Sequence, residues 1–227
     1  MTRNGGKPIL ALFLALLFTV VCSPAQERPA GESRASGRGK ESILIAYLSR
    51  TKNTEAVARM IHGYTGGRMV PVELAKPYPE DYRAIVQQVD RENETGFLPP
   101  IITKIEDIGS YQTVFVGFPT WDMTLPPPMR SFLKSHNLEG KAVVPFNTNA
   151  GYGVGSGFEK LKELSPNSEV LEGISIKGGV ERDGVLFVME GKKAEETRKQ
   201  IGEWLRKIGV APTSKEQSTK KEERITK

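Results

Sequence analysis

Three short segments of the chain combine side chains that could bind a phosphorylated, planar ligand. Residues 49–54 read Ser-Arg-Thr-Lys-Asn-Thr and stand directly before a helical pattern. The first N–H groups of a helix are unpaired and lie at the positive end of its dipole, so hydroxyls and amides there can help to hold a phosphate. The alternative is ordinary N-capping of the helix by Ser49, Asn53 or Thr54.

The other two segments could hold a flat ring. In 118–125, Trp121 stands beside polar residues and could either stack on a planar ligand or cover the core. In 147–155, alternating glycines permit close backbone approach to a ligand, although such a run can also be a plain flexible loop. Each segment is a weak signal alone. Together they predict one site, with a phosphate at 49–54 and a ring between 118–125 and 147–155.

The elements around these segments predict how the segments are brought together. Continuous apolar runs, typical of strands buried on both faces of a parallel sheet, occur at 42–48, 113–118 and 141–146. Weaker strands are expected at 70–74, where Pro71 favours the sheet edge, and at 169–176. Helical patterns alternate with the strands, at 54–65, 82–92, 126–133, 157–164 and 192–207. This order predicts a parallel sheet covered by helices on both faces, with ligands bound beyond the carboxyl ends of its strands.

The sequence resembles the flavodoxin family at each of the three segments. The resemblance is carried by 45–54 with Ala58 and Ile61, by 118–121 with 126–133, and by 144–148 with 151–156. It covers residues 43–178 and the last helix. It implies an α/β fold of flavodoxin type, which is a three-layer, doubly wound sheet of five parallel strands in the order 2-1-3-4-5 with helices on both faces.

The same resemblance implies that the site binds FMN non-covalently. The phosphate would be held by Ser49, Arg50, Thr51, Asn53 and Thr54. One side of the isoalloxazine ring would be lined by Pro119, Thr120 and Trp121, and the other side by Thr148, Asn149, Gly151, Tyr152 and Gly153.

Two residues depart from the family pattern. Lys52 stands where the family usually has glycine, so it adds attraction for a phosphate but loses the backbone freedom of glycine. It is counted with the residues expected to bind the cofactor, which makes fourteen. Tyr152 replaces a smaller residue, and its ring could stack on the flavin or block it. Asp122 is interpreted as a solvated loop carboxylate. If FMN binds, Asp122 could instead lower the potential of the flavin by like-charge proximity.

Three functions are compatible with these residues. The leading hypothesis is an FMN protein that transfers electrons to or from a redox partner protein or a small-molecule acceptor. The second is an FMN-dependent NAD(P)H oxidoreductase acting on quinone-type acceptors. The third is a non-redox binding module that keeps the fold without FMN. No chemistry is assigned to 178–188, which reads as a turn and an extended stretch, and His62 and His136 are expected at the surface or at helix ends.

Charge and composition exclude other classes. The chain has 227 residues and a formal charge of +5. Segments 1–25, 26–40 and 212–227 each carry +2, which leaves −1 for 41–211 and argues against a nucleic-acid partner. The single cysteine excludes an intramolecular disulfide framework and a cysteine-based zinc site.

The ends of the chain read as export and linker segments. Residues 1–25 have the layout of a secretory signal peptide cleaved after Ala25, which predicts a periplasmic or extracellular protein. The alternatives are an uncleaved membrane anchor at 9–22 or lipidation of Cys22. Residues 26–40 are expected to be a flexible linker, 41–211 a single flavodoxin-like domain and 212–227 a polar, disordered tail.

Overall fold

The computed structural model describes residues 43–210. Its sheet is wholly parallel, with the strand order β2-β1-β3-β4-β5 and with β6 also paired to β4. The strands are β1 Ile43–Tyr47, β2 Arg68–Pro71, β3 Thr113–Pro119, β4 Ala142–Asn149, β5 Glu169–Val170 and β6 Ile174–Lys177. The predicted order 2-1-3-4-5 is therefore confirmed. The predictions for 1–25, 26–40 and 212–227 lie outside the described residues.

The strand expected at 169–176 is divided into two pieces, β5 and β6. Val143 of β4 pairs with Val170, but Phe146 pairs with Ile174, so one extra residue is inserted between the two ladders. Gly173 lies in this insertion and passes so close to Phe158 that an added Cβ would come within 2.7 Å of the ring. The sheet therefore has six strands among the described residues, rather than the five expected.

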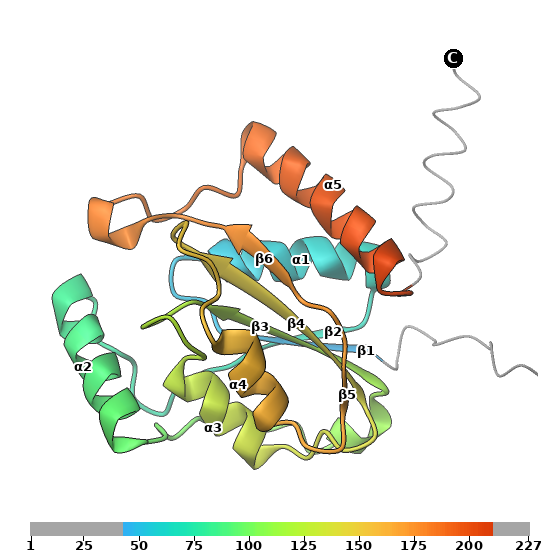
Figure 1. Cartoon of the computed structure of the whole chain (residues 1–227), viewed down its shortest axis with the longest axis horizontal. Helices are drawn as coiled ribbons and strands as arrows, with labels where there is room; N and C mark the ends of the chain where they lie inside the picture. The colour runs from blue at the N-terminus through green and yellow to red at the C-terminus, as the bar shows by residue number, and fades with distance from the viewer. Residues whose placement is uncertain (1–42, 211–227) are drawn as a thin grey trace, which may run out of the picture. The chain divides into compact units, whose positions relative to one another are not determined.

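Helices cover both faces of the sheet (Figure 1). The helices are α1 Asn53–Thr65, α2 Tyr82–Thr95, α3 Pro127–Ser135, α4 Gly157–Glu163 and α5 Gly191–Lys207, with short 3₁₀ turns η2 Ile108–Ser110 and η3 Glu181–Asp183. Helices α1 and α5 pack on one face, and α3 and α4 on the other. Alternate residues of β1 supply the two cores, because successive side chains of a strand point to opposite faces.

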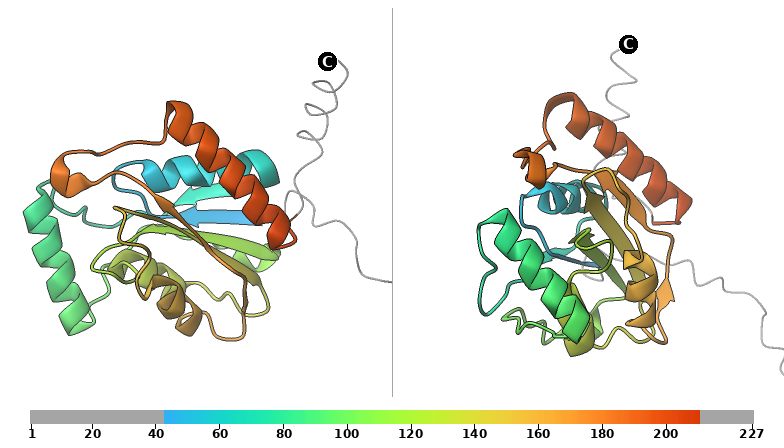
Figure 2. Two further views of the ribbon diagram at one scale, coloured as in Figure 1. Left: turned by 45° about the horizontal axis from the view of Figure 1, so that its top comes forward. Right: turned by 60° about the vertical axis from the view of Figure 1, so that its left-hand side comes forward.

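Helix α2 is placed differently from the other four. It stands beyond the carboxyl ends of the strands, next to α3, instead of lying on a face of the sheet (Figure 2). Its inward side buries Ile85 and Val89. Because every strand is parallel, the loops that follow β1, β3 and β4 emerge at this same edge, opposite α2. No helix within residues 43–210 is long and apolar enough to cross a membrane.

Candidate functional site

A cavity of about 320 Å³ opens at the carboxyl edge of the sheet. This volume is in the range of small-molecule sites. Its walls come from the loops after β1, β3 and β4, from α2 and from the segment that follows β6. The lining residues are Arg50, Thr51, Asn53, Thr54, Tyr82, Ile85, Val86, Val89, Asp90, Pro119, Thr120, Trp121, Asp122, Thr148, Asn149, Ala150, Tyr152, Gly178, Gly179, Val180, Glu181 and Arg182.

Ten of the fourteen residues predicted from the sequence line this one cavity. The ten are Arg50, Thr51, Asn53, Thr54, Pro119, Thr120, Trp121, Thr148, Asn149 and Tyr152. The four that do not line it are Ser49, Lys52, Gly151 and Gly153. All four belong to the same loops, so the structure brings the three predicted segments together as expected.

The first loop ends in a strained residue. Lys52 is the N-cap of α1 and has a φ of 65°, in the left-handed region that glycine adopts without steric cost. It makes no side-chain capping bond. Instead, the amide of Glu55 donates to Ser49 Oγ at 3.2 Å, so the Ser49 side chain accepts a hydrogen bond from the first turn of α1 and does not line the cavity. Lys52 therefore holds a left-handed backbone conformation that costs a residue with a side chain more than it costs glycine.

Arg50 is engaged by protein groups on all three guanidinium nitrogens. Its Nε donates to Glu181 Oε1 at 2.7 Å, and its Nη atoms donate to the carbonyls of Pro79 at 2.9 Å and Glu80 at 2.6 Å. The sequence predicted Arg50 as a phosphate ligand. In the structure Arg50 lines the cavity, and its guanidinium links three segments at the cavity edge.

Asn53 and Thr54 also reach across the fold. The Asn53 side-chain amide donates to the carbonyl of Leu186 at 2.6 Å, and its oxygen accepts from the amide of Val188 at 3.1 Å. Thr54 Oγ1 and Thr148 Oγ1 form a buried hydrogen bond of 2.7 Å. The first loop is thereby tied to both the 186–188 stretch and the third loop, which neither the phosphate-site nor the N-capping interpretation anticipated.

The second and third loops are bonded to each other. Thr120 Oγ1 donates to the carbonyl of Gly153 at 2.9 Å, and the amide of Thr120 donates to the carbonyl of Thr148 at 2.8 Å. Asn149 Oδ1 accepts the amides of Gly151 at 2.7 Å and Gly153 at 3.2 Å. The third loop is therefore organised by the side chain of Asn149, and its alternating glycines do not form a loose loop.

Two aromatic side chains of these loops differ in exposure. Trp121 is half-buried and contacts Tyr78 edge-on, with ring centroids 5.4 Å apart. Tyr152 is 65% exposed and stands at the rim of the cavity. Tyr152 therefore leaves the interior open. Asp122 follows Trp121 with a φ of 49°, and its carboxylate accepts from Asn93 Nδ2 at 2.7 Å, so it is anchored to α2 although it is exposed.

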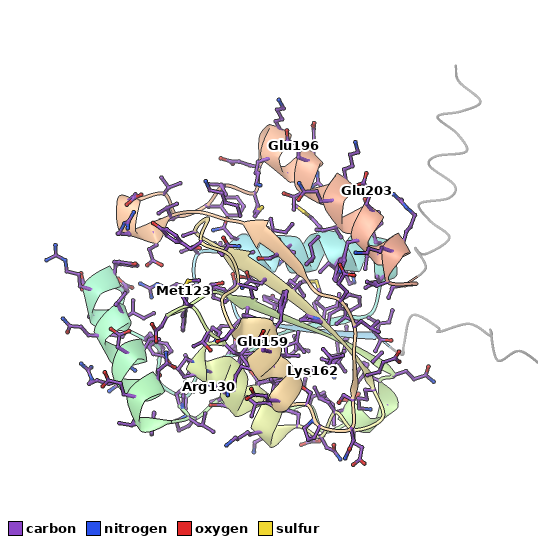
Figure 3. All side chains as sticks on the ribbon, in the orientation of Figure 1. Met123, Arg130, Glu159, Lys162, Glu196 and Glu203 are labelled. Carbon is purple, nitrogen blue, oxygen red and sulfur yellow. The ribbon has the colours of Figure 1, made fainter. Side chains whose placement is uncertain are left out.

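A partly buried polar cluster lies behind Tyr78, the residue whose ring contacts Trp121. The hydroxyl of Tyr78 donates to Glu92 of α2, which also accepts from Gln88 at 2.8 Å. Burial and the neighbouring Glu92 raise the pKa of Tyr78 well above its usual value. Arg130 lies where α3 faces α2 (Figure 3), donates to Asn93, and has a pKa lowered by burial.

The sequence interpretation missed two walls of the cavity. One is α2, whose Tyr82, Ile85, Val86 and Val89 form an apolar lining, and the other is 178–182. The sequence predicted a helix at 82–92, but nothing local indicated what that helix faces. His136 was expected at the surface or at a helix end. It is the C-cap of α3, but it is buried, and its Nε2 accepts from the amide of Ile105 at 3.2 Å.

No group of His, Cys, Asp and Glu side chains within residues 43–210 is arranged to hold a metal ion.

Comparisons with known proteins identify one family model and several solved structures of similar fold. The flavodoxin family model matches residues 42–191. A candidate flavoprotein from Bacteroides eggerthii is 31% identical, with 74% of this chain and 98% of that chain covered and a TM-score of 0.61. A second, from Bacteroides uniformis, is 22% identical (73% and 98% covered, TM-score 0.59). A Lactobacillus acidophilus flavoprotein solved in complex with FMN is 18% identical (60% and 93% covered, TM-score 0.54).

Among proteins with curated descriptions, none is significantly similar in sequence to this chain. The family match covers most of the described residues and includes all three loops of the cavity. The match is supported by the similarity to the Bacteroides eggerthii protein over nearly the whole of that protein. The chain therefore belongs to the flavodoxin family.

Proposed function

We propose that this protein binds FMN non-covalently in the cavity and acts in electron transfer. The observation that carries the proposal is the convergence of the three loops on one cavity, with ten predicted ligand residues in its lining. Family membership supports it, and the FMN complex of the Lactobacillus acidophilus protein, which shares the fold, is consistent with it.

The chemistry of the lining fits FMN. Hydroxyls of Thr51 and Thr54 stand at the start of α1, where helix N–H groups and the helix dipole favour a phosphate. Pro119, Trp121 and Tyr152 offer apolar and aromatic surface to a flat ring. These residues would hold the cofactor, and bound FMN would supply the redox chemistry.

The chain's own contribution is to hold the loops in one arrangement. The side chain of Asn149 accepts hydrogen bonds from the amides of Gly151 and Gly153, and the hydroxyl of Thr120 donates to the carbonyl of Gly153. These backbone groups are engaged within the protein, so we assign their role to shaping the ring side of the cavity. The buried bond between Thr54 and Thr148 fixes the phosphate side relative to the ring side.

The test is a titration of the purified full chain with FMN, followed by flavin absorbance and fluorescence. Thr54→Ala and Trp121→Ala should each weaken binding by about 1 kcal/mol or more, through loss of a hydroxyl contact and of aromatic surface. Matched controls are Thr95→Ala and Phe97→Ala, which alter exposed side chains outside the cavity. Absence of binding by a folded protein, or equal affinities for the site and control variants, would contradict the proposal.

Electron transfer is separated from NAD(P)H oxidoreductase activity by stopped-flow reduction. The FMN-loaded protein is mixed with NADH or NADPH, and flavin bleaching is followed. Slow or absent bleaching is expected for an electron carrier. Fast, saturable bleaching would make the protein an oxidoreductase instead.

Export of the protein is a further part of the proposal, supported by the charge, apolar core and small residues of 1–25. N-terminal sequencing of the protein recovered from outside the cytoplasm should begin at Gln26. An intact Met1 would contradict cleavage.

A further inference from the structure

A second hollow lies where α1 and α5 pack on the same face of the sheet (Figures 1 and 2). Its volume of about 390 Å³ is in the range of small-molecule sites. We call it the α1–α5 groove, and it shares no lining residue with the cavity at the carboxyl edge of the sheet. The groove is lined by Ala56, Arg59, Met60, Gly63, Tyr64, Met189 and Arg198.

The five lining residues of α1 form one strip along the helix. They follow the helical spacing from Ala56, through Arg59 and Met60, to Gly63 and Tyr64, which puts them on one side of α1. Eight residues at the helical rise of 1.5 Å span about 12 Å. A ligand that fills the groove is therefore elongated and lies along α1.

The floor of the groove is apolar. Met60 and Met189 are both buried, and the hydroxyl of Thr197 donates to Sδ of Met189 at 3.8 Å. Tyr64 adds a half-buried ring, and its hydroxyl donates to the carbonyl of Arg198 at 3.0 Å. Methionine side chains adapt to irregular apolar partners, so this floor suits a flexible hydrocarbon chain.

Gly63 keeps the groove open. It lies within α1, where glycine weakens a helix relative to alanine. Its φ is not positive, and a Cβ added to it would meet no atom within 4 Å, so neither the backbone nor crowding requires glycine here. A larger side chain at this position would instead project into the groove. The glycine therefore leaves room for a ligand that approaches the backbone of α1.

The charges at the groove favour an anion. The lining contains two cations, Arg59 and Arg198, and no acidic residue. Arg198 is exposed and takes part in none of the ion pairs of the described residues. Arg59 donates through Nε and Nη2 to Glu55 Oε1, at 3.0 Å and 2.6 Å, and this pair does not use Nη1. Both guanidiniums can therefore attract one negative head group.

The polar groups of the lining favour an acyl chain over a peptide. Apart from the two guanidiniums and the hydroxyl of Tyr64, the lining side chains have no hydrogen-bonding N or O atoms. A peptide laid in the groove would have to pair its backbone N–H and C=O groups, whereas a hydrocarbon chain has none to pair. An elongated apolar chain with one acidic end matches the shape, the floor and the cations together.

We propose that the α1–α5 groove binds a free fatty acid, with the acyl chain on Met60 and Met189 and the carboxylate at Arg59 and Arg198. The binding is non-covalent. It goes beyond the proposed function, since none of the groove residues belongs to the cavity assigned to FMN.

The test is a calorimetric titration of the purified full chain with decanoate. Uncharged 1-decanol and the cationic decyltrimethylammonium carry the same chain with different head groups. Decanoate should bind about fivefold more tightly than 1-decanol, in keeping with exposed ion pairs, and the cation more weakly than either. Between hexanoate and decanoate, affinity should rise about threefold for each added methylene group. Saturating FMN should leave these affinities unchanged.

A substitution that fills the groove locates the site. Gly63→Leu should weaken decanoate binding about tenfold or more, and Gly63→Ala should weaken it less. His62→Leu adds the same side chain at the neighbouring exposed position, outside the lining, and should have no effect. Circular dichroism and urea unfolding check that each variant is folded. The apolar run at 9–22 is common to all of these proteins, so it contributes equally to every titration.

Substitution of the cations tests the head-group contact. Arg59→Gln combined with Arg198→Gln should lower the affinity for decanoate to that for 1-decanol, while 1-decanol binding is unchanged. Lys199→Gln is the control, because it removes an exposed cation of α5 that does not line the groove.

Several outcomes would overturn the proposal. Equal affinities of the parent protein for decanoate and 1-decanol, or equal effects of Gly63→Leu and His62→Leu, would remove it. Hexaglutamate that binds as tightly as decanoate would assign the groove to an acidic peptide. Sedimentation that reveals a dimer dissolved by Gly63→Leu would assign it to a second copy of the chain. Displacement of decanoate by FMN would place decanoate in the other cavity, whereas failure of FMN binding alone would leave this proposal standing.

Discussion

The Nε atom of Arg50 lies 2.7 Å from Oε1 of Glu181, although 131 residues separate the two in the chain. The same guanidinium bonds the carbonyls of Pro79 and Glu80, which immediately precede α2. One side chain therefore joins the first loop, the approach to α2 and the η3 segment. Both members of the ion pair are about four-fifths buried, at 19% and 21% side-chain exposure, so water screens them less than an ordinary surface pair.

Glu181→Gln should increase the preference of the site for FMN over riboflavin, which lacks the phosphate. The substitution neutralises the partner of Arg50, so the cation at the edge of the phosphate loop becomes available to an anion. A charge-assisted hydrogen bond from Arg50 to the phosphate would then raise the FMN-to-riboflavin affinity ratio by about tenfold. Titrations with both flavins check it.

The matched control is Glu172→Gln, which breaks the exposed pair with Lys207 away from the cavity. A structural change in the η3 segment would lower the affinity for riboflavin as well as for FMN, because both flavins have the same ring. The riboflavin affinity of Glu181→Gln therefore detects such a change. An unchanged or lower ratio in Glu181→Gln would mean that Arg50 does not reach the phosphate even when released.

Thr54→Val should destabilise the fold by about 1–3 kcal/mol, since it leaves the buried hydroxyl of Thr148 without its partner. Thr148→Val should do the same. The double variant should cost less than the sum of the two single changes, because no polar group is then stranded. Urea unfolding of the four proteins gives the coupling free energy, and simple additivity would argue against a direct hydroxyl pair.

Lys52→Gly should stabilise the protein by roughly 0.5–1 kcal/mol, because the left-handed backbone of Lys52 costs a side-chain-bearing residue more than glycine. Lys104→Gly is the control, at an exposed coil position without a positive φ, and should give no increase in stability. Thermal or urea unfolding measures both. A loss of stability in Lys52→Gly would show that the Lys52 side chain makes a compensating interaction.

Tyr78 should make the protein sensitive to alkaline pH. Its pKa is raised above 10.0 by burial and by Glu92, so above about pH 10 the unfolded chain loses the phenol proton while the folded protein keeps it. The free energy of unfolding therefore falls as pH rises through this range. Tyr78→Phe should be less stable at pH 7, since it loses the bond to Glu92, but should show a shallower decline above pH 10.

The comparison for Tyr78 is Tyr82→Phe, which removes an exposed hydroxyl from α2. That variant should retain the alkaline decline of the parent protein. Urea unfolding between pH 8 and 11 records the slopes. Identical slopes in the parent and in Tyr78→Phe would show that Tyr78 is not the group responsible.

The parallel sheet and the position of the site were predictable because their signals are local, whereas the strand order was implied only by the resemblance to the flavodoxin family. The apolar runs of β1, β3 and β4 have no polar face, which requires helices on both sides and hence parallel strands. Parallel strands deliver their following loops to one edge. Thr54, Trp121 and Thr148 were therefore placed in one cavity from sequence position alone.

Pairings across the fold were not predictable in the same way. The role of Arg50 depends on Glu181 and on two backbone carbonyls near residue 80. The sequence of the polar loop around Arg50 gives no sign of these distant partners. The division of β5 from β6 depends on the ring of Phe158 against Gly173. In each case the residue that determines the structure is distant in the sequence from the residue whose role it determines.

By itself, the sequence determined the alternation of strands and helices, the edge at which ligands would bind and the residues of the three loops, because hydrophobic periodicity and turn chemistry act over a few neighbouring residues. Only the tertiary structure decided that α2 closes the cavity as an apolar wall, that Arg50 is a link between segments and that His136 is buried. The physical reason is that burial and charge pairing depend on what a side chain faces, and that is fixed only when distant segments pack together.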